Sequence, residues 1–168
     1  MAVEIRAVVI TVSDRRANGN LADESGLTLV QLLQEMGAIV LDTVILPDDL
    51  EPLAAKLRMY ADAPDVNLIL TTGGTGFSPR DNTPEATLSV IERDAPGLAE
   101  AMRMETLRQT PTAMLSRAVC GIRAGTLIIN LPGSPKAVRE CFAVIRPVLG
   151  HAVTLLAGHA HEEAKQAK

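Results

Sequence analysis

Two hydrophobic patterns alternate along this chain, and their alternation restricts the folds open to it. Residues 7–12 (AVVITV) form a nearly continuous apolar, β-branched run, which is typical of a strand buried on both faces of a parallel sheet. After a polar loop, an apolar stripe at helical spacing follows and can end at Gly37. The stripe consists of Leu29, Leu32, Leu33 and Met36. A strand followed by a helix is the repeating unit of an α/β fold.

The same alternation continues to the end of the chain. Further strands are expected where the composition returns to Val, Ile, Leu and Thr, at 38–46, 67–72 and 126–131. The expected helices cover 50–57, a segment from Thr83 to a break at Pro96, 98–105, 135–145, and a last helix beginning at Pro147. With right-handed crossovers, this order predicts a three-layer α/β/α sandwich with a mostly parallel central sheet.

The length of 168 residues fits one domain with one core. We assign residues 1–158 to this domain and residues 159–168 (HAHEEAKQAK) to a polar C-terminal tail that frays. Cys120 and Cys141 have no paired spacing and lie beside apolar residues, so we expect buried thiols rather than a redox or metal pair.

Charge and aromatic content disfavour nucleic-acid binding. The chain carries 16 Lys and Arg against 20 Asp and Glu, and it has two Phe, one Tyr and no Trp, which leaves little to attract phosphates generally or to stack bases. No apolar run approaches the roughly 18 residues of a membrane span. The N-terminus resembles a first strand more than a signal peptide. We therefore expect a cytoplasmic protein that binds neither nucleic acid nor membranes.

Polar or glycine-rich residues follow each of the four expected strands. In parallel α/β sheets ligands bind at the carboxyl ends of the strands, so these residues are expected to share one edge of the sheet. They are Ser13, Asp14, Arg15 and Arg16, then Asp48 and Asp49, then Gly73, Gly74, Thr75 and Gly76, and finally Gly133 and Ser134.

The segment TTGGTG, residues 71–76, indicates what kind of ligand this edge takes. Glycine allows a positive φ and has no Cβ, so consecutive amides can turn inward and bind an anion such as phosphate. The segment lacks the Lys-Ser/Thr ending of a P-loop and the spacing of a dinucleotide fingerprint. A tight turn without any ligand is the alternative that this motif alone leaves open.

Asp48 and Asp81 are the candidate metal ligands. Mg²⁺ takes one or two carboxylates together with substrate phosphates, whereas an isolated aspartate is more often a helix cap or a loop acid. An anionic substrate of an acidic chain also needs local positive charge. The candidates for it, which are alternatively solvated surface residues, are Arg15, Arg16, Arg80, Arg117 and Lys136.

Other polar residues give weaker signals. From the residues alone, Ser116 reads as a turn serine and His151 as a structural residue within a helix. His159 and His161 have a possible metal spacing but fall in the polar tail, where solvated side chains are expected. No Ser/His/Asp or Cys/His set can be assembled from the loops, which argues against covalent hydrolysis.

Four segments, in order and spacing, resemble the molybdopterin adenylyltransferase family of molybdenum cofactor biosynthesis: TTGGTGFSPRDNTPEAT, PGLAEAMR, PTAMLSRA and LPGSPKAV. The family includes bacterial proteins and the G domain of plant and animal fusion proteins, and the likeness runs from about Ile5 to the final helix. It implies a nucleotidyltransferase that transfers AMP from Mg-ATP to the terminal phosphate of molybdopterin, giving adenylyl-molybdopterin and pyrophosphate. The fusion partner is absent, so only the adenylation step is expected.

The resemblance also assigns roles to residues. It implies that Asp48 and Asp81 are catalytic and hold or orient Mg²⁺, and it raises Ser116 and Ser13 to substrate contacts. With the loop residues above, the predicted substrate-binding set is Ser13, Asp14, Thr72, Gly73, Gly74, Thr75, Gly76, Ser116, Gly133 and Ser134.

Assembly and partners are implied by the resemblance alone. It implies a homotrimer or a hexamer made of two trimers, with a molybdenum-inserting protein as a possible partner downstream. The alternative function is a module that binds or carries molybdopterin without catalysis. Three points stay open. They are which pocket holds pterin and which holds adenine, the number of Mg²⁺ ions, and whether the pathway uses molybdenum or tungsten.

Overall fold

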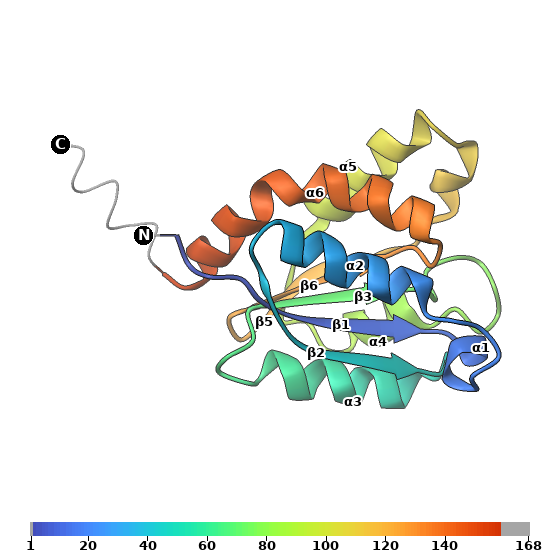
Figure 1. The fold of residues 1–168 in the computed structure, drawn as a ribbon, viewed down its shortest axis with the longest axis horizontal. Helices are drawn as coiled ribbons and strands as arrows, with labels where there is room; N and C mark the ends of the chain where they lie inside the picture. The colour runs from blue at the N-terminus through green and yellow to red at the C-terminus, as the bar shows by residue number, and fades with distance from the viewer. Residues whose placement is uncertain (1, 159–168) are drawn as a thin grey trace.

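A single mixed sheet organises the structure, a computed structural model that describes residues 2–158. Its six strands lie in the order β2-β1-β3-β6-β5-β4 (Figure 1). The four strands with parallel neighbours are β1 (Arg6–Val12), β2 (Ile39–Leu46), β3 (Leu68–Thr72) and β6 (Thr126–Leu131). Two short antiparallel strands, β4 (Arg93–Asp94) and β5 (Cys120–Arg123), extend the sheet beyond β6.

Helices cover both faces of the sheet, as Figure 1 shows. One face carries α2 (Glu24–Glu35), α5 (Pro96–Leu107) and α6 (Pro135–Leu156). The other carries α3 (Leu50–Ala61) and α4 (Thr83–Leu88). Two further short turns of helix, α1 (Asp14–Ala17) and η1 (Pro111–Leu115), lie in the connections. The predicted three-layer α/β/α sandwich with a mostly parallel sheet is confirmed.

The alternation of side chains along each strand divides the apolar residues between two cores. In β1, Ala7 and Val9 pack under α2 and α6, while Val8 and Ile10 pack under α3 and α4. Burying one such large apolar side chain contributes about 1.5–3 kcal/mol. Because both faces of β1, β3 and β6 are buried, their sequences are apolar almost throughout, which is why these strands were predictable.

The prediction that a last helix begins at Pro147 is wrong. Pro147 lies inside α6, which is continuous from Pro135 to Leu156. Proline removes one backbone donor from a helix and disfavours it locally. Here the buried stripe of Ile145, Leu149 and Val153 continues past the proline, and this packing keeps the helix in one piece.

Two smaller differences concern the region between α4 and β6. The predicted helix from Thr83 to a break at Pro96 is too long: α4 ends at Leu88, and β4 lies between it and Pro96. Pro96 instead occupies the first turn of α5, where a proline removes no helical hydrogen bond, and α5 extends over 12 residues. The strands β4 and β5 were not predicted, because β4 has only two residues, both exposed, and carries no strand pattern.

The remaining general predictions concern cysteines, histidines and membranes. Cys120 and Cys141 are buried free thiols, and burial raises their pKa to about 12 and about 11 respectively. His151 lies on α6 with an exposed side chain, whereas His159 and His161 lie outside the described residues. Within residues 2–158, no helix is both long and apolar enough to cross a membrane.

Candidate functional site

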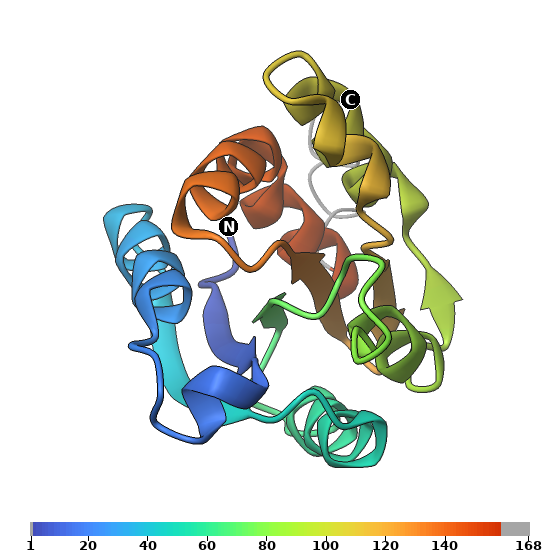
Figure 2. The same cartoon turned by 90° about the vertical axis from the view of Figure 1, so that its right-hand side faces the viewer.

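The loops that follow β1, β2, β3 and β6 meet at one edge of the sheet. The view in Figure 2 faces this edge, so that the start of α1, the loop after β3 and the start of α6 lie around a common centre. Two cavities open there, and Gly74, Asp81 and Gly133 line both of them. The predicted convergence of separate loops on one edge is therefore confirmed.

The first cavity, which we call the polar cavity, has a volume of about 600 Å³. Charged residues from three loops line it: Asp14, Arg15, Arg16, Asp48, Arg80 and Asp81. The second, the helix-side cavity, has a volume of about 350 Å³ and lies against α5, η1 and α6. Apolar side chains such as Met102 and Leu115 form part of its wall. A charged compartment thus adjoins a less polar one.

The glycine loop, residues 73–76, separates the two cavities. Gly73 and Gly74 have φ angles of +98° and +67°, which L-residues with side chains rarely adopt. At Gly73 a Cβ would lie 2.2 Å from the carbonyl oxygen of Val12. The Thr83 hydroxyl donates to the Gly73 carbonyl over 2.9 Å, which ties the loop to the start of α4. Both glycines are therefore required by the backbone path.

Three successive amides of this loop have no hydrogen-bond partner among the described residues. The Gly73 amide donates to the Leu131 carbonyl over 3.1 Å and extends the sheet pairing. Within residues 2–158, the amides of Gly74, Thr75 and Gly76 donate no hydrogen bond. Because unpaired backbone donors are uncommon in folded proteins, and consecutive ones form anion-binding concavities, residues 74–76 have the composition of a phosphate cradle.

Asp48 and Asp81 both lie beside the glycine loop, Asp48 near Gly74 and Asp81 near Gly76. Both line the polar cavity, and a Cβ on Gly74 would lie 3.2 Å from Oδ1 of Asp48. The Asp81 Oδ2 accepts the Ser78 amide over 3.0 Å, and the Asp48 Oδ2 accepts the Asp14 amide over 2.9 Å. Among the described residues, no hydrogen bond reaches the Oδ1 of either aspartate. Each acid is thus held by one oxygen and keeps the other for a ligand.

Burial raises the pKa of the Asp48 carboxyl, and the negative charges of Asp14 and Asp81 raise it further. The hydrogen bond from the Asp14 backbone opposes this shift. A carboxylate that is costly to keep ionised is stabilised by any nearby cation. The electrostatics of the site therefore favour a positively charged ligand beside Asp48.

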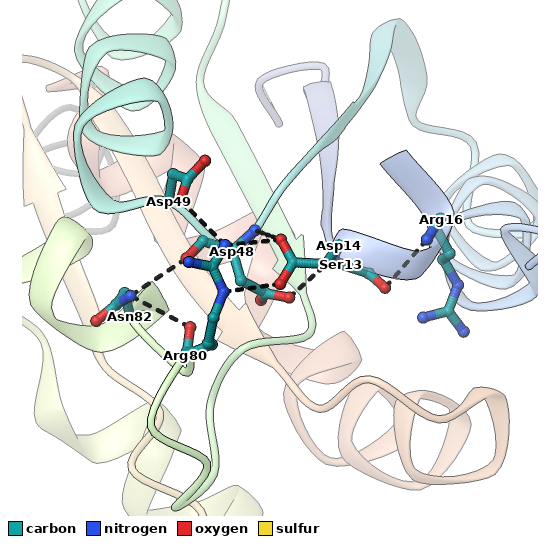
Figure 3. Close-up of polar contacts among 7 residues, drawn as sticks. All are labelled: Ser13, Asp14, Arg16, Asp48, Asp49, Arg80 and Asn82. Atoms are coloured by element: carbon teal, nitrogen blue, oxygen red, sulfur yellow. Dashed lines mark hydrogen bonds and ion pairs between the residues drawn. The ribbon is translucent and has the colours of Figure 1, made fainter. Parts of the chain in front are cut away.

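Arg80 holds the acidic loops together, as Figure 3 shows. Its guanidinium donates to both carboxylate oxygens of Asp14 over 2.8 Å and to Asp49 over 3.0 Å. This pairing keeps the pKa of Asp14 below its ordinary value. Arg15 and Arg16 also line the polar cavity, so three of the five cations singled out in the sequence lie around it.

The other two predicted cations have different places. Arg117 lines neither cavity: it donates to the carbonyls of Gly76 and Asp81 over 2.8 Å each and pairs with Glu85. It therefore fixes the glycine loop from behind. Lys136 is 84% exposed at its side chain and pairs with Glu140 on α6.

Comparison with known proteins gives the family. A family profile described as "Probable molybdopterin binding domain" matches residues 8–151. The chain belongs to this family. The match includes every loop of the site, so the resemblance carried by the four sequence segments is confirmed.

Individual relatives are similar over most of this domain. The chain is 40% identical to a molybdopterin adenylyltransferase of Helicobacter pylori over 153 residues, 90% of this chain and 87% of that protein. It is 45% identical over 150 residues, 88% of this chain, to the molybdenum cofactor synthesis protein cinnamon of Drosophila melanogaster, of which it spans only 25%. The crystal structure of the molybdopterin biosynthesis enzyme MoaB from Thermus thermophilus superimposes with a TM-score of 0.86 at 45% identity, covering 92% of this chain and 97% of that one.

Three serines predicted to contact the substrate line the cavities of this molybdopterin-binding domain. Each of them also accepts a hydrogen bond from a nearby backbone amide. The Ser13 and Ser134 hydroxyls accept the amides of Arg16 and Ala137 and so cap α1 and α6 at the polar cavity. Ser116 lines the helix-side cavity, and its hydroxyl accepts the Ala118 amide over 3.3 Å.

Thr72 has a different position from the one predicted. It lines neither cavity, is fully buried, and donates to the Pro132 carbonyl over 2.7 Å. Its hydroxyl joins the loop after β3 to the loop after β6. Thr72 therefore holds the walls of the site in place and does not form them.

Several polar residues that line the cavities were missed in the sequence, among them Asn130 and Arg103. Asn130 is fully buried beside the helix-side cavity and donates to the hydroxyls of Thr71 and Thr87 over 3.0 and 2.9 Å. Arg103 lines the same cavity and donates to the carbonyl of Ala118 over 3.0 Å. An asparagine inside the apolar run TLIINL was the available signal for the first; Arg103 gave none beyond its place in PGLAEAMR.

Proposed function

We propose that this chain is a molybdopterin adenylyltransferase, which transfers AMP from Mg-ATP to the terminal phosphate of molybdopterin. The observation that carries the proposal is that Asp48 and Asp81 line one cavity together with Gly74, whose amide is the first of three successive unpaired amides. Relatives at about 40% identity over 90% of this chain bear the same activity in their names.

Magnesium fits the donor set of this site. Among residues 2–158, no group of three or more His, Cys, Asp or Glu could hold a metal ion by itself. Mg²⁺ does not need such a group, because it keeps several waters and takes one or two carboxylates plus phosphate oxygens. We assign its protein ligands to the free Oδ1 atoms of Asp48 and Asp81. When bound, the ion would neutralise charge on the triphosphate.

The protein's own contribution is to position the two substrates and to stabilise charge. A phosphate oxygen of molybdopterin attacks the α-phosphorus of ATP, the bond from that phosphorus to the β-phosphate oxygen breaks, and pyrophosphate leaves. A phosphate nucleophile is already ionised at neutral pH, so no general base is required. The amides of residues 74–76 and the guanidinium of Arg15 stabilise the phosphate charge as it shifts toward the leaving group.

The two cavities divide the substrates by polarity. The polar cavity is lined by both candidate metal ligands and by Arg15, Arg16 and Arg80, so we assign the triphosphate to it. The helix-side cavity, at about 350 Å³, is within the usual size range of small-molecule sites and has apolar walls. We assign a ring system to it, with its phosphate directed to Gly74, one of the three residues that line both cavities.

Pyrophosphate release tests the proposal. Parent protein given molybdopterin and Mg-ATP is expected to release pyrophosphate and form adenylyl-molybdopterin. Asp48→Asn and Asp81→Asn should each lower kcat by about 100-fold or more, since a charge that stabilises the transition state is lost. Asp94→Asn, an exposed acid on β4, is the matched control and should retain parent activity.

Two outcomes would contradict the proposal in different ways. Near-parent turnover in both Asp48→Asn and Asp81→Asn would remove the metal-binding role from these acids. Tight binding of molybdopterin by the parent without any pyrophosphate release would replace the enzyme by a carrier module, the alternative function of this fold.

Assembly, compartment and domain limits stay predictions. A trimer or a hexamer is supported by large apolar side chains exposed on α5 and α6, which are Met104, Leu107, Val148 and Leu155. Sedimentation of the purified chain would test it. The cytoplasmic location, the limit of the domain at residue 158, and a molybdenum-inserting partner rest on the sequence and the resemblance.

A further inference from the structure

Asp14 and Asp48 exchange hydrogen bonds in both directions. The Asp14 amide donates to Oδ2 of Asp48 over 2.9 Å, and the Asp48 amide donates to Oδ1 of Asp14 over 3.0 Å. Figure 3 shows the two residues facing each other from the loops after β1 and β2. Because both contacts are made at once, the Asp48 side chain cannot turn without loss of the bond to the Asp14 amide.

Arg80 fixes this pair from a third loop. Its Nε and Nη2 donate to Oδ2 and Oδ1 of Asp14, and Nη2 also reaches Asp49. The Asn82 side chain donates to the carbonyls of Asp48 and Arg80 over 3.2 Å each, so the same loop holds the Asp48 backbone as well. The loops after β1, β2 and β3 are thereby joined by one planar guanidinium.

We infer that Asp14 and Arg80 are positioning residues that aim the Asp48 carboxylate into the polar cavity, an inference that rests on the proposed function. Both oxygens of Asp14 accept from Arg80, and one of them also accepts the Asp48 amide. Asp14 is thus occupied by protein donors, while Asp48 keeps its Oδ1 for a ligand. This role differs from the substrate contact that the sequence assigned to Asp14.

The geometry favours positioning over a purely structural role. The Arg80 and Asp14 side chains are 55% and 37% exposed, and exposed ion pairs contribute little to global stability. Partners that orient a ligating carboxylate, in contrast, commonly change activity or metal affinity when they are removed. Variants at these two positions are therefore expected to fold and to differ from the parent in the orientation of the Asp48 carboxylate.

The chain supplies a matched control pair. Arg123 donates from Nε and Nη2 to both oxygens of Asp62 over 2.9 and 3.0 Å, the same two-pronged geometry as Arg80 on Asp14. That pair joins the end of α3 to β5, and neither residue lines the polar or the helix-side cavity. Arg123→Gln therefore removes an equivalent ion pair without touching the site.

The test compares Arg80→Gln, Arg80→Lys, Asp14→Asn, Asp14→Ala and Arg123→Gln. Arg80→Gln and Asp14→Ala should lower kcat by about ten-fold or more, with the KM for molybdopterin near the parent value. Arg80→Lys should recover part of the loss, because lysine reaches one oxygen but not both. The kcat of Asp14→Asn should be higher than that of Asp14→Ala, because the side-chain oxygen of asparagine can still accept the backbone N–H of Asp48. Arg123→Gln should match the parent.

A second readout needs no substrate. In nuclear magnetic resonance experiments on the protein alone, the Asp48 amide should exchange its hydrogen about ten-fold faster in Asp14→Ala, because a hydrogen bond to a charged acceptor is lost. Parent-like exchange and kcat in Asp14→Ala and Arg80→Gln would overturn the inference, as would equal losses in Asp14→Asn and Asp14→Ala. A parent without pyrophosphate release would refute the proposed function alone, and the exchange rates would still decide this inference.

Discussion

Replacing Gly73 by alanine tests the conformation of the glycine loop. The residue has a φ of +98°, and an added Cβ would lie 2.2 Å from the Val12 carbonyl oxygen. A side chain at positive φ costs about 1–2 kcal/mol. The overlap adds about 1–3 kcal/mol, because the neighbouring atom is backbone in a central strand and cannot move freely. The free energy of unfolding should therefore fall by about 2–5 kcal/mol in total.

Two other glycines separate these two contributions. Gly37 also has a positive φ, +84°, but a Cβ there would meet nothing within 4 Å. Gly37→Ala should therefore lose only the conformational part, about 1–2 kcal/mol. Gly97, in the first turn of α5, has neither a positive φ nor a close neighbour, so Gly97→Ala should be neutral or stabilising by up to about 1 kcal/mol.

Urea unfolding at equilibrium measures all three variants, with an unchanged m-value as the sign that the folded state remains compact. Gly73→Ala should in addition lose most pyrophosphate release under conditions where it is folded, because the amides of residues 74–76 follow the displaced residue. If Gly73→Ala costs no more stability than Gly37→Ala, the close approach of Gly73 to β1 is refuted. Full activity in a folded Gly73→Ala protein would refute the role of the loop amides.

Further predictions concern α6 and the contact behind the glycine loop. Pro147→Ala should raise the free energy of unfolding by about 1–3 kcal/mol, since alanine restores the missing helical donor; a loss of stability in calorimetry would contradict this. The pairing with Arg117 lowers the pKa of Glu85 below its ordinary 4.5, so this contribution to stability is present above pH 4.5 and is lost as the pH falls through the lower pKa of the folded state. Arg117→Gln should therefore have a lower free energy of unfolding than the parent near neutral pH, and this difference should shrink in acid. An equal difference in urea unfolding near neutral pH and in acid would refute the contribution of the ion pair.

The parts of the fold that the sequence predicted are those whose local pattern and burial agree. The strands β1, β3 and β6 are covered on both faces and therefore read as unbroken apolar runs. The two exposed residues of β4 have no such pattern, since this strand forms only by pairing with β5 across a long connection. The predicted start of a helix at Pro147 was wrong. Proline is favoured in the first turn of a helix, but here the buried apolar stripe on both sides of it keeps α6 continuous.

In the candidate site as well, features set by the local sequence pattern could be predicted, and features set by tertiary contacts could not. Asp48, Asp81 and the glycine loop could be placed together because the carboxyl ends of parallel strands share one edge. Roles that depend on side-chain direction could not: Arg117 supports the loop from behind, Thr72 is buried, and Asn130 satisfies two threonine hydroxyls from inside the core. The substrate itself came from the resemblance, because an anion cradle with two acids does not specify a pterin.

The most direct measurement is a crystal structure of the chain with Mg²⁺ and a non-hydrolysable ATP analogue. We predict triphosphate oxygens in the polar cavity within hydrogen-bonding distance of the Gly74 amide, and a cation between those phosphates and the carboxylates of Asp48 and Asp81. A nucleotide bound elsewhere, or bound here with both aspartates turned away from its phosphates, would contradict the account.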